Sequence, residues 1–190
     1  MTVIALVLLV VSAATPLLAP PLRRVVADPV LPVAAVSVVL LSAAAVVAAG
    51  ADPTGGWRLG AALVLAVVVA TTAGSHVVRA VYRLMRREFL PARVRPSAPT
   101  PAGDPDPPAD GERPEAVLRG GAWIGYLERA AVAATLLAGW PEGIALVLAV
   151  KGVGRYAELR ETNAPETFII GTLASLLWAA AAAGVAQLLR

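Results

Sequence analysis

Long apolar stretches dominate the chain, and their length decides which folds are open to it. A helix needs about 20 mostly apolar residues to cross a hydrocarbon core about 30 Å thick. The chain has six such stretches, and four or five of them are long enough. The fifth along the chain reaches that length only with a polar continuation. The stretches are residues 2–19, 33–49, 59–78, 123–139, 143–150 with a polar continuation to 161, and 167–189. The sequence therefore predicts an all-α fold, a polytopic transmembrane helical bundle of about six spans.

The positive charges lie in alternate gaps between these stretches. Of the 16 Lys and Arg residues, all but Arg58, Arg129 and Arg190 follow this pattern. Cytoplasmic loops collect Lys and Arg, so the first, third and fifth spans should run inward, with both termini extracytoplasmic. The start of the chain has neither the basic region nor the small-residue cleavage motif of a secretory signal. We therefore expect the first span to be retained as part of a multi-pass protein of the cell membrane.

Composition excludes several classes of protein. Hydrophobic residues make up 58% of the chain and charged residues 15%, whereas soluble domains are about 25% charged. Fifteen Arg against one Lys, with abundant Ala, Val, Gly and Pro, is typical of a GC-rich bacterial genome and indicates the bacterial inner membrane. The chain has no Cys and one His, which excludes thiol nucleophiles, disulfides and Cys- or His-cluster metal sites.

The composition also bears on cofactors, partners and catalysis. We expect no metal and no cofactor. No Ser-His or paired-Asp catalytic arrangement occurs along the chain, so the sequence predicts a protein that is not an enzyme. The net charge of +3 comes from Arg in the cytoplasmic gaps, so it indicates contact with the bilayer, and with anionic lipids at the cytoplasmic face, and no nucleic acid.

One segment divides the chain into two halves. Residues 91–114 carry eight Pro together with several acidic residues and show no apolar periodicity. A segment of that composition cannot bury enough apolar surface to offset its chain entropy. We therefore predict an N-terminal three-span half at 1–90 with a basic cytoplasmic helix end, a disordered Pro-rich cytoplasmic linker at 91–118, and a C-terminal three-span charged half at 119–190.

A basic stripe lies on the helix that leaves the third span. Its members follow spacings of three and four, so they share one helix face. They are His76, Arg79, Arg83, Arg86 and Arg87. Near a membrane surface each Arg attracts anionic lipid by about 1 kcal/mol, so the stripe is a candidate lipid-headgroup contact. The alternative is that these residues act only as orientation signals.

The second half carries charged residues inside its predicted spans. Glu128 and Arg129 lie within the fourth span, where an unpaired ion costs about 2.5 to 3.5 kcal/mol at a helix centre. If the fourth and fifth spans form a hairpin centred near Pro141, position 128 lies level with position 154. We therefore expect Glu128 to pair with Arg155, on a polar stripe that also contains Lys151 and Glu158.

The next turn predicts a second charge pair and a set of close helix contacts. With a turn centred on Asn163, Arg160 falls level with Glu166 at the cytoplasmic boundary. Small residues at intervals of four let helix backbones approach closely in a membrane. The candidate packing residues of this kind are Gly121, Gly125, Gly171, Ser175, Ala179 and Ala183.

Three motifs in the second half resemble a known family. They are GAWIGYLER at 121–129, AVKGVGRYAEL at 149–159 and ETFIIGTLAS at 166–175. Together they are similar to the C-terminal half of an uncharacterised family of bacterial multi-span inner-membrane proteins. The resemblance covers roughly the last 70 residues. The family's N-terminal motif of His, Gly-Asp-Phe and Gln has no equivalent here, and the N-terminal half is unmatched. Because the family has no assigned activity, the resemblance implies a module and no reaction.

Two functions remain open for the charged half. A buried ion-pair network can fix the register of the helices, and this reading predicts a structural or partner-binding module. Such a module would join a membrane-protein partner or a second copy of the chain. Alternatively, intramembrane charges mark ion or substrate pathways. The chain would then be a small transporter or channel component in which Glu128, Arg129, Lys151 and Arg155 line a cytoplasm-facing site.

Overall fold

The computed structural model describes residues 1–22, 26, 28–89, 121–154, 156 and 164–190. Helices make up this part of the chain, and the described residues form no strand. The elements are α1 (Thr2–Ala14), η1 (Thr15–Leu18), α2 (Ala19–Leu22), α3 (Val30–Ala49), α4 (Gly56–Thr72), α5 (Gly74–Phe89), α6 (Gly121–Leu137), α7 (Gly143–Gly154) and α8 (Ala164–Leu188). The predicted linker at 91–118 lies outside the described residues, as do Arg155, Glu158 and Arg160.

Four helical stretches are long and apolar enough to cross a membrane. They are Thr2–Leu22, Val30–Ala49, Gly56–Met85 and Glu166–Leu188. The helix Gly143–Gly154 is apolar but shorter, and α6 carries Glu128 and Arg129 along its 17 residues. The predicted all-helical class is therefore confirmed, and four helices have the length and composition to span a membrane. The count of six spans stays a prediction.

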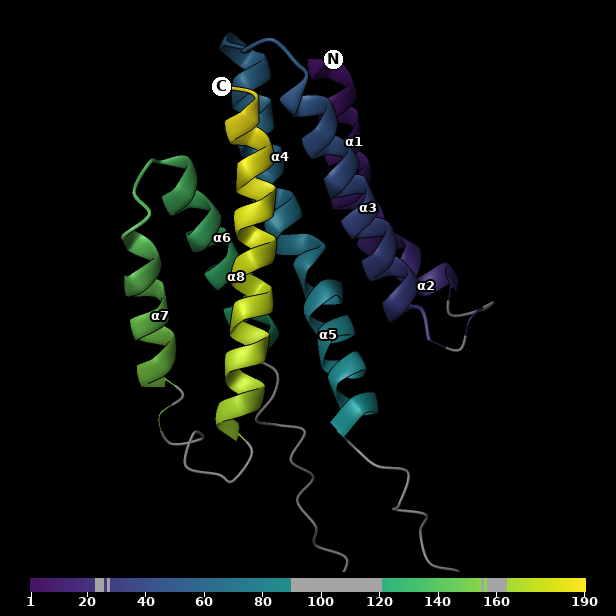
Figure 1. Ribbon diagram of the computed structural model, residues 1–190, viewed down its shortest axis with the longest axis vertical. Coiled ribbons are helices and arrows are strands. Elements are labelled where there is room, and N and C mark those ends of the chain that lie inside the picture. The colour runs from purple at the N-terminus through teal and green to yellow at the C-terminus, as the bar shows by residue number, and fades with distance from the viewer. Residues whose placement is uncertain (23–25, 27, 90–120, 155, 157–163) are drawn as a thin grey trace, which may run out of the picture.

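The helices run alternately up and down between two ends of the molecule (Figure 1). The N-terminus, the connection between α3 and α4, and the C-terminus lie at one end, where the Thr54 N–H donates to the Leu189 carbonyl at 2.9 Å. At the other end, α5 finishes and α8 begins. In the sequence prediction these two ends correspond to the extracytoplasmic and cytoplasmic faces.

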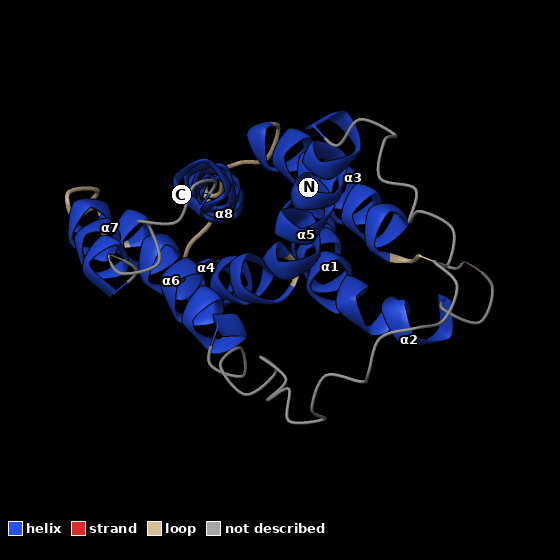
Figure 2. Cartoon of the chain, turned by 90° about the horizontal axis from the view of Figure 1, so that it is seen from below, coloured by secondary structure: helices blue, strands red, loops and turns tan. Residues whose placement is uncertain are grey.

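Helix α8 is the central element. It packs against α3, α4, α5 and α6, while α1 packs on α3 and α4, and α7 packs mainly on α6. Figure 2 shows α6 and α7 on one side of α8 and α1 and α3 on the other. Because α4 and α5 belong to the first half of the chain and α8 to the second, the two halves share one interior.

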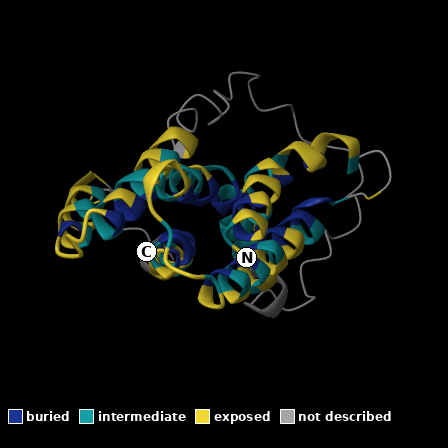
Figure 3. Ribbon diagram, turned by 90° about the horizontal axis from the view of Figure 1, so that it is seen from above, coloured by how far each residue is buried: buried dark blue, intermediate teal, exposed yellow. Residues whose placement is uncertain are grey.

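Small side chains fill much of the interior, and many large apolar side chains are exposed. Figure 3 shows the buried residues gathered where the helices face one another and the exposed residues on the outer faces. The fully buried positions are mainly alanines: Ala5, Ala44, Ala48, Ala62, Ala66, Ala70, Ala133, Ala179, Ala182 and Ala186. In contrast, Val46 is 74% exposed and Leu177 is 70% exposed. Close packing of small residues drives helix association where lipid already solvates large apolar side chains. This distribution suits a bilayer and agrees with the length of the helices.

The third predicted span is interrupted. Helix α4 ends at Thr72, α5 begins at Gly74, and Ala73 lies between them. The His76 N–H bonds to the Ala73 carbonyl, three residues back, instead of to the carbonyl four residues back. The Thr71 and Thr72 hydroxyls each donate to the Val68 carbonyl, at 2.8 and 2.7 Å. Hydroxyl bonds of this kind commonly bend helices. The break leaves backbone carbonyls for other donors, and the second half of the chain supplies one.

Candidate functional site

Helix α6 directs its two adjacent charges toward different neighbours. The Glu128 Oε2 lies 2.5 Å from the Lys151 Nζ of α7, and the two side chains are 14% and 16% exposed. The Lys151 ammonium also lies 5.6 Å from the centre of the Phe168 ring in α8. Successive helix residues point about 100° apart, so Arg129 faces another part of the bundle. The Glu128–Lys151 pair thus joins α6 to α7 and brings Lys151 near α8.

The turn between α6 and α7 explains why Lys151 is the partner. Gly139, with φ of +74°, donates its N–H to the Leu136 carbonyl, and the Trp140 N–H donates to the Thr135 carbonyl at 2.8 Å. These bonds form a Schellman motif, which ends a helix at a left-handed glycine. The turn is therefore centred before Pro141. Because the centre lies earlier in the chain, the α7 residue level with Glu128 lies about one helical turn before position 154.

The sequence predicted Arg155 as the partner of Glu128. The ion pair that Glu128 forms is with Lys151, whereas Arg155 lies outside the described residues. A pair of Arg160 with Glu166 also involves a residue outside them. Glu166 itself is an exposed residue in the first turn of α8, and a negative charge there is favourable. Both predicted Arg partnerships stay predictions.

Arg129 crosses from the second half of the chain to the break between α4 and α5. Its side chain is 5% exposed. Its Nη2 donates to the Thr71 carbonyl at 3.2 Å and to the Ser75 Oγ at 2.8 Å. A Cβ at Gly74 would lie 2.6 Å from the Arg129 Cδ, so the guanidinium reaches the break across a position without a side chain. Arg129 thus stabilises a carbonyl that the interrupted helix leaves available.

Other polar contacts also join helices, and sequence reasoning did not assign them. The Trp178 Nε1 of α8 donates to the Val69 carbonyl of α4 at 3.2 Å. The Tyr82 hydroxyl of α5 donates to the Thr167 carbonyl of α8 at 3.2 Å. Each contact depends on a helix from the other half of the chain, so no local sequence pattern marks it. An isolated donor inside a membrane helix needs a protein acceptor.

Two further contacts lie near the ends of the bundle. The Gln187 Nε2 donates to the Leu136 carbonyl at 3.0 Å and ties the end of α8 to the end of α6. The Thr15 and Ser37 hydroxyls lie 2.7 Å apart and join η1 to α3.

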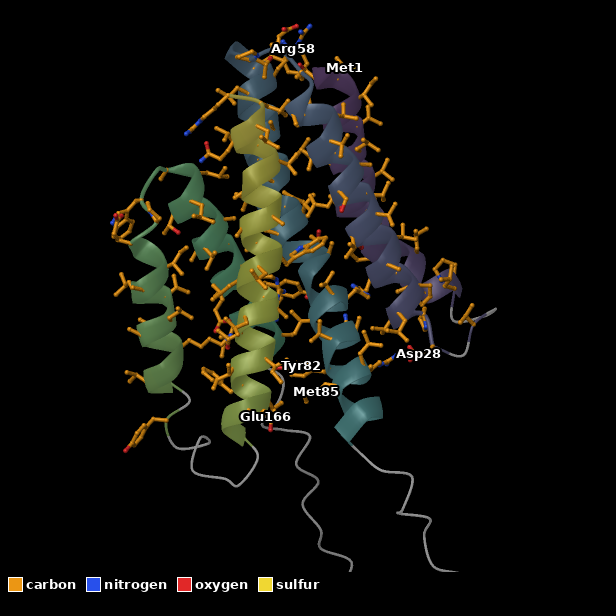
Figure 4. The ribbon with its side chains drawn as sticks, in the orientation of Figure 1. Met1, Asp28, Arg58, Tyr82, Met85 and Glu166 are labelled. Atoms are coloured by element: carbon orange, nitrogen blue, oxygen red, sulfur yellow. The ribbon has the colours of Figure 1, made fainter. Side chains whose placement is uncertain are left out.

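The predicted basic stripe divides into different environments. Arg83 forms an ion pair with Asp28, and Asp28 and Tyr82 both lie toward the lower end of Figure 4. Arg79 is exposed, and its Nε donates to the Ser75 carbonyl at 3.0 Å. His76 is 8% exposed, which places it among protein neighbours and away from lipid headgroups. The side chains of Arg86 and Arg87 lie outside the described part of α5.

The predicted packing residues of α8 are all buried. They are Gly171, Ser175, Ala179 and Ala183. Gly171 accommodates a side chain instead of a second backbone, because a Cβ there would overlap the Tyr82 hydroxyl. On α6, a Cβ at Gly125 would lie 3.4 Å from the Arg129 Nη1, and Gly121 is the first residue of the helix.

The described residues offer no group of three or more His, Asp and Glu residues able to hold a metal ion. A cavity of about 600 Å³ lies between α3, α5 and α8. Its lining is apolar except for Ser42 and the Trp178 indole, and it includes Leu41, Val81 and Leu173. The cavity and the charged residues therefore occupy different parts of the bundle.

Comparisons of the chain with protein-family models, with curated proteins and with solved structures find no match. The resemblance of the second half to an uncharacterised membrane family stays a prediction.

Proposed function

We propose that this chain is a non-enzymatic membrane module of about six spans, in which a buried charge network sets the register of the helices. The observation that carries the proposal is the Glu128–Lys151 pair, since both side chains are largely covered by protein and are bonded to each other. Buried ion pairs are best attested as devices that specify register and partner choice. The module's role is then structural or partner-binding.

The arrangement of Arg129 supports the same reading. Its bonds run to Thr71 and Ser75 in the first half of the chain, while Glu128 and Lys151 connect helices of the second half. The charged residues of α6 therefore contact both the first half of the chain and α7. These contacts hold helices together, which is what a structural or assembly role requires. Such a role does not require an open polar path across the bundle.

Two shorter helices complete the proposed six spans. A helix of 17 residues, like α6, is about 26 Å long, which nearly matches the hydrocarbon core. Helix α7 has 12 residues and requires the polar continuation predicted from the sequence. Helix α6 packs against α4 and α8, and α7 packs on α6, where Lys151 pairs with Glu128. We propose that they form a hairpin embedded in the membrane beside α8.

The distribution of charge supports the proposed orientation. Arg79 and Arg83 lie on α5, which runs toward the end of the bundle where α8 begins (Figure 1), and Lys151 lies in the last turn of α7. Arg58 lies at the opposite end (Figure 4), as does the C-terminal Arg190 (Figure 1). A surplus of positive charge marks the cytoplasmic side. The 91–118 segment is then cytoplasmic, and the two termini are extracytoplasmic.

The transport alternative requires a polar path across the bundle. The cavity between α3, α5 and α8 has no charged residue in its lining. Glu128 and Lys151 neutralise each other, which leaves neither as a vacant ion site. These two observations favour the structural reading over a transporter or channel component.

An ion-flux assay separates the two functions. The purified chain and its Glu128→Gln/Lys151→Met variant are reconstituted into liposomes, and fluxes of protons, potassium and chloride are followed with ion-sensitive dyes. We expect both proteins to match empty liposomes. A flux that the wild type supports and the double variant loses would contradict the proposal and favour transport.

A further inference from the structure

Two arginine side chains from different helices converge on Ser75. The Arg129 Nη2 of α6 donates to the Ser75 hydroxyl at 2.8 Å, and the Arg79 Nε of α5 donates to the Ser75 carbonyl at 3.0 Å. A single neutral residue therefore holds two guanidinium groups near each other. Like charges repel, and the repulsion is stronger in a medium of low dielectric constant.

Neither guanidinium has a carboxylate partner among the described residues. The ion pairs of that part of the chain are Glu128 with Lys151 and Asp28 with Arg83. The acidic neighbours of the two arginines are thus already used. The Arg129 Nε is buried without a hydrogen-bond partner, and its side chain is 5% exposed. A buried cation in that state calls for a counter-ion.

One edge of the Arg129 guanidinium has no polar partner in the described structure. The Nη1 forms no hydrogen bond within the described structure and lies beside Gly125, where an added Cβ would be 3.4 Å away. The Tyr126 ring centre lies 5.3 Å from the Arg129 Cζ. Arg79 is exposed on the neighbouring helix. Helices α5 and α6 are only lightly packed against each other, so an anion would reach this edge by entering between them.

We propose that Arg79 and Arg129 form a binding site for an anionic phosphate group, closed by Ser75 and reached past Gly125. Guanidinium groups bind phosphate through paired, charge-assisted hydrogen bonds. The phosphate belongs to a lipid headgroup or to a soluble phosphate. This site is distinct from general attraction of the basic stripe to the membrane surface, because Arg83 already pairs with Asp28 and Arg129 lies on another helix.

Binding can be measured on the full-length chain, purified in a neutral detergent and stripped of lipid. Phosphatidylglycerol is titrated against phosphatidylcholine, and inorganic phosphate against chloride at equal ionic strength. The readouts are the melting temperature and lipid adducts in native mass spectrometry. A response to phosphatidylglycerol alone assigns the site to a lipid headgroup, and a response to inorganic phosphate assigns it to a soluble anion.

The variants distinguish a site from a charged surface. Removing one charge-assisted contact should weaken binding on the order of tenfold, so we expect that loss for Arg79→Gln. Gly125→Leu should give a similar loss, because it covers Nη1 without removing a charge. Arg83→Gln is the matched control and should change affinity less than Arg79→Gln. Equal losses for Arg79→Gln and Arg83→Gln, or no response of the wild type to either probe, would overturn the proposal.

Discussion

Gly74 illustrates how single positions join the two halves of the chain. A Cβ at this residue would lie 2.6 Å from the Arg129 Cδ and 2.8 Å from the Trp178 Cδ1. The absence of a side chain lets a cation of α6 and an aromatic ring of α8 reach the break between α4 and α5. A side chain at position 74 would therefore collide with both groups.

We expect Gly74→Ala to destabilise the protein by about 1 to 3 kcal/mol, because the added methyl group overpacks a filled interior. Gly60→Ala is the matched control, since nothing lies within 4 Å of its added Cβ. That change should be neutral or stabilise the helix by about 0.5 to 1 kcal/mol. Thermal unfolding in detergent measures both, and equal stability of the two variants would contradict the packing account.

The sequence allowed some of these residues to be predicted. Charge within an apolar stretch identified Glu128 and Arg129, because ions at that depth need partners, and Lys151 was predicted on the polar stripe opposite them. The choice of partner depended on the turn. The left-handed Gly139 shifts the hairpin centre, and a count that took Pro141 as the centre could not include that shift. The role of Gly74 depends on neighbours distant in sequence, which no local pattern reveals.

At the scale of the elements, α5 and α8 meet through a tyrosine and a glycine. The Tyr82 hydroxyl donates to the Thr167 carbonyl, and its ring occupies the space in front of Gly171. The spacing of small residues predicted close approach at Gly171, and the structure shows what approaches. The contact joins the first half of the chain to the second near the end at which α8 begins.

Gly171→Ala should lower stability by about 1 to 3 kcal/mol, because the methyl group overlaps Tyr82. Gly184→Ala on the same helix has open space around its added Cβ and should not. In a Tyr82→Ala background the effect of Gly171→Ala should largely disappear, since residues in contact are not additive. Full persistence of the Gly171→Ala loss in that background would contradict the contact.

The elements themselves were largely predictable, and their interruptions were not. Apolar length identified the stretches that correspond to α1, α3, α4 and α8. The break at Ala73 arises from competition by the Thr71 and Thr72 hydroxyls for helix carbonyls. The sequence prediction treated 59–78 as one continuous span, so it ran through the break and into the first residues of α5.

For the whole molecule, alternate helix directions place the predicted cytoplasmic gaps at one end and the extracytoplasmic gaps at the other (Figure 1). Because the chain has no Cys, single cysteines report the side directly. Cysteines replacing Thr54 and Glu142 should react with an impermeant reagent outside intact cells, and one replacing Ala102 should not. Labelling of the Ala102 position in sealed cells would reverse the proposed orientation.

A deletion tests the independence of the membrane part from the Pro-rich segment. Removal of residues 97–111 should leave the melting temperature of the detergent-solubilised protein unchanged, because their composition provides no apolar surface to bury. Size-exclusion chromatography checks that the protein stays monodisperse. An aggregated or unstable product would show that the segment contributes to folding.

The Glu128–Lys151 pair provides the most direct test of the structural role of the charge network. Removing one member of a buried pair typically costs about 3 to 5 kcal/mol, because the other charge is stranded. Thermal unfolding in detergent is measured for Glu128→Gln, for Lys151→Met and for the double variant, with the exposed Glu142→Gln as control. We expect two unstable single variants, a double variant that recovers much of the loss, and an unchanged control. Purely additive losses in the double variant would contradict the account.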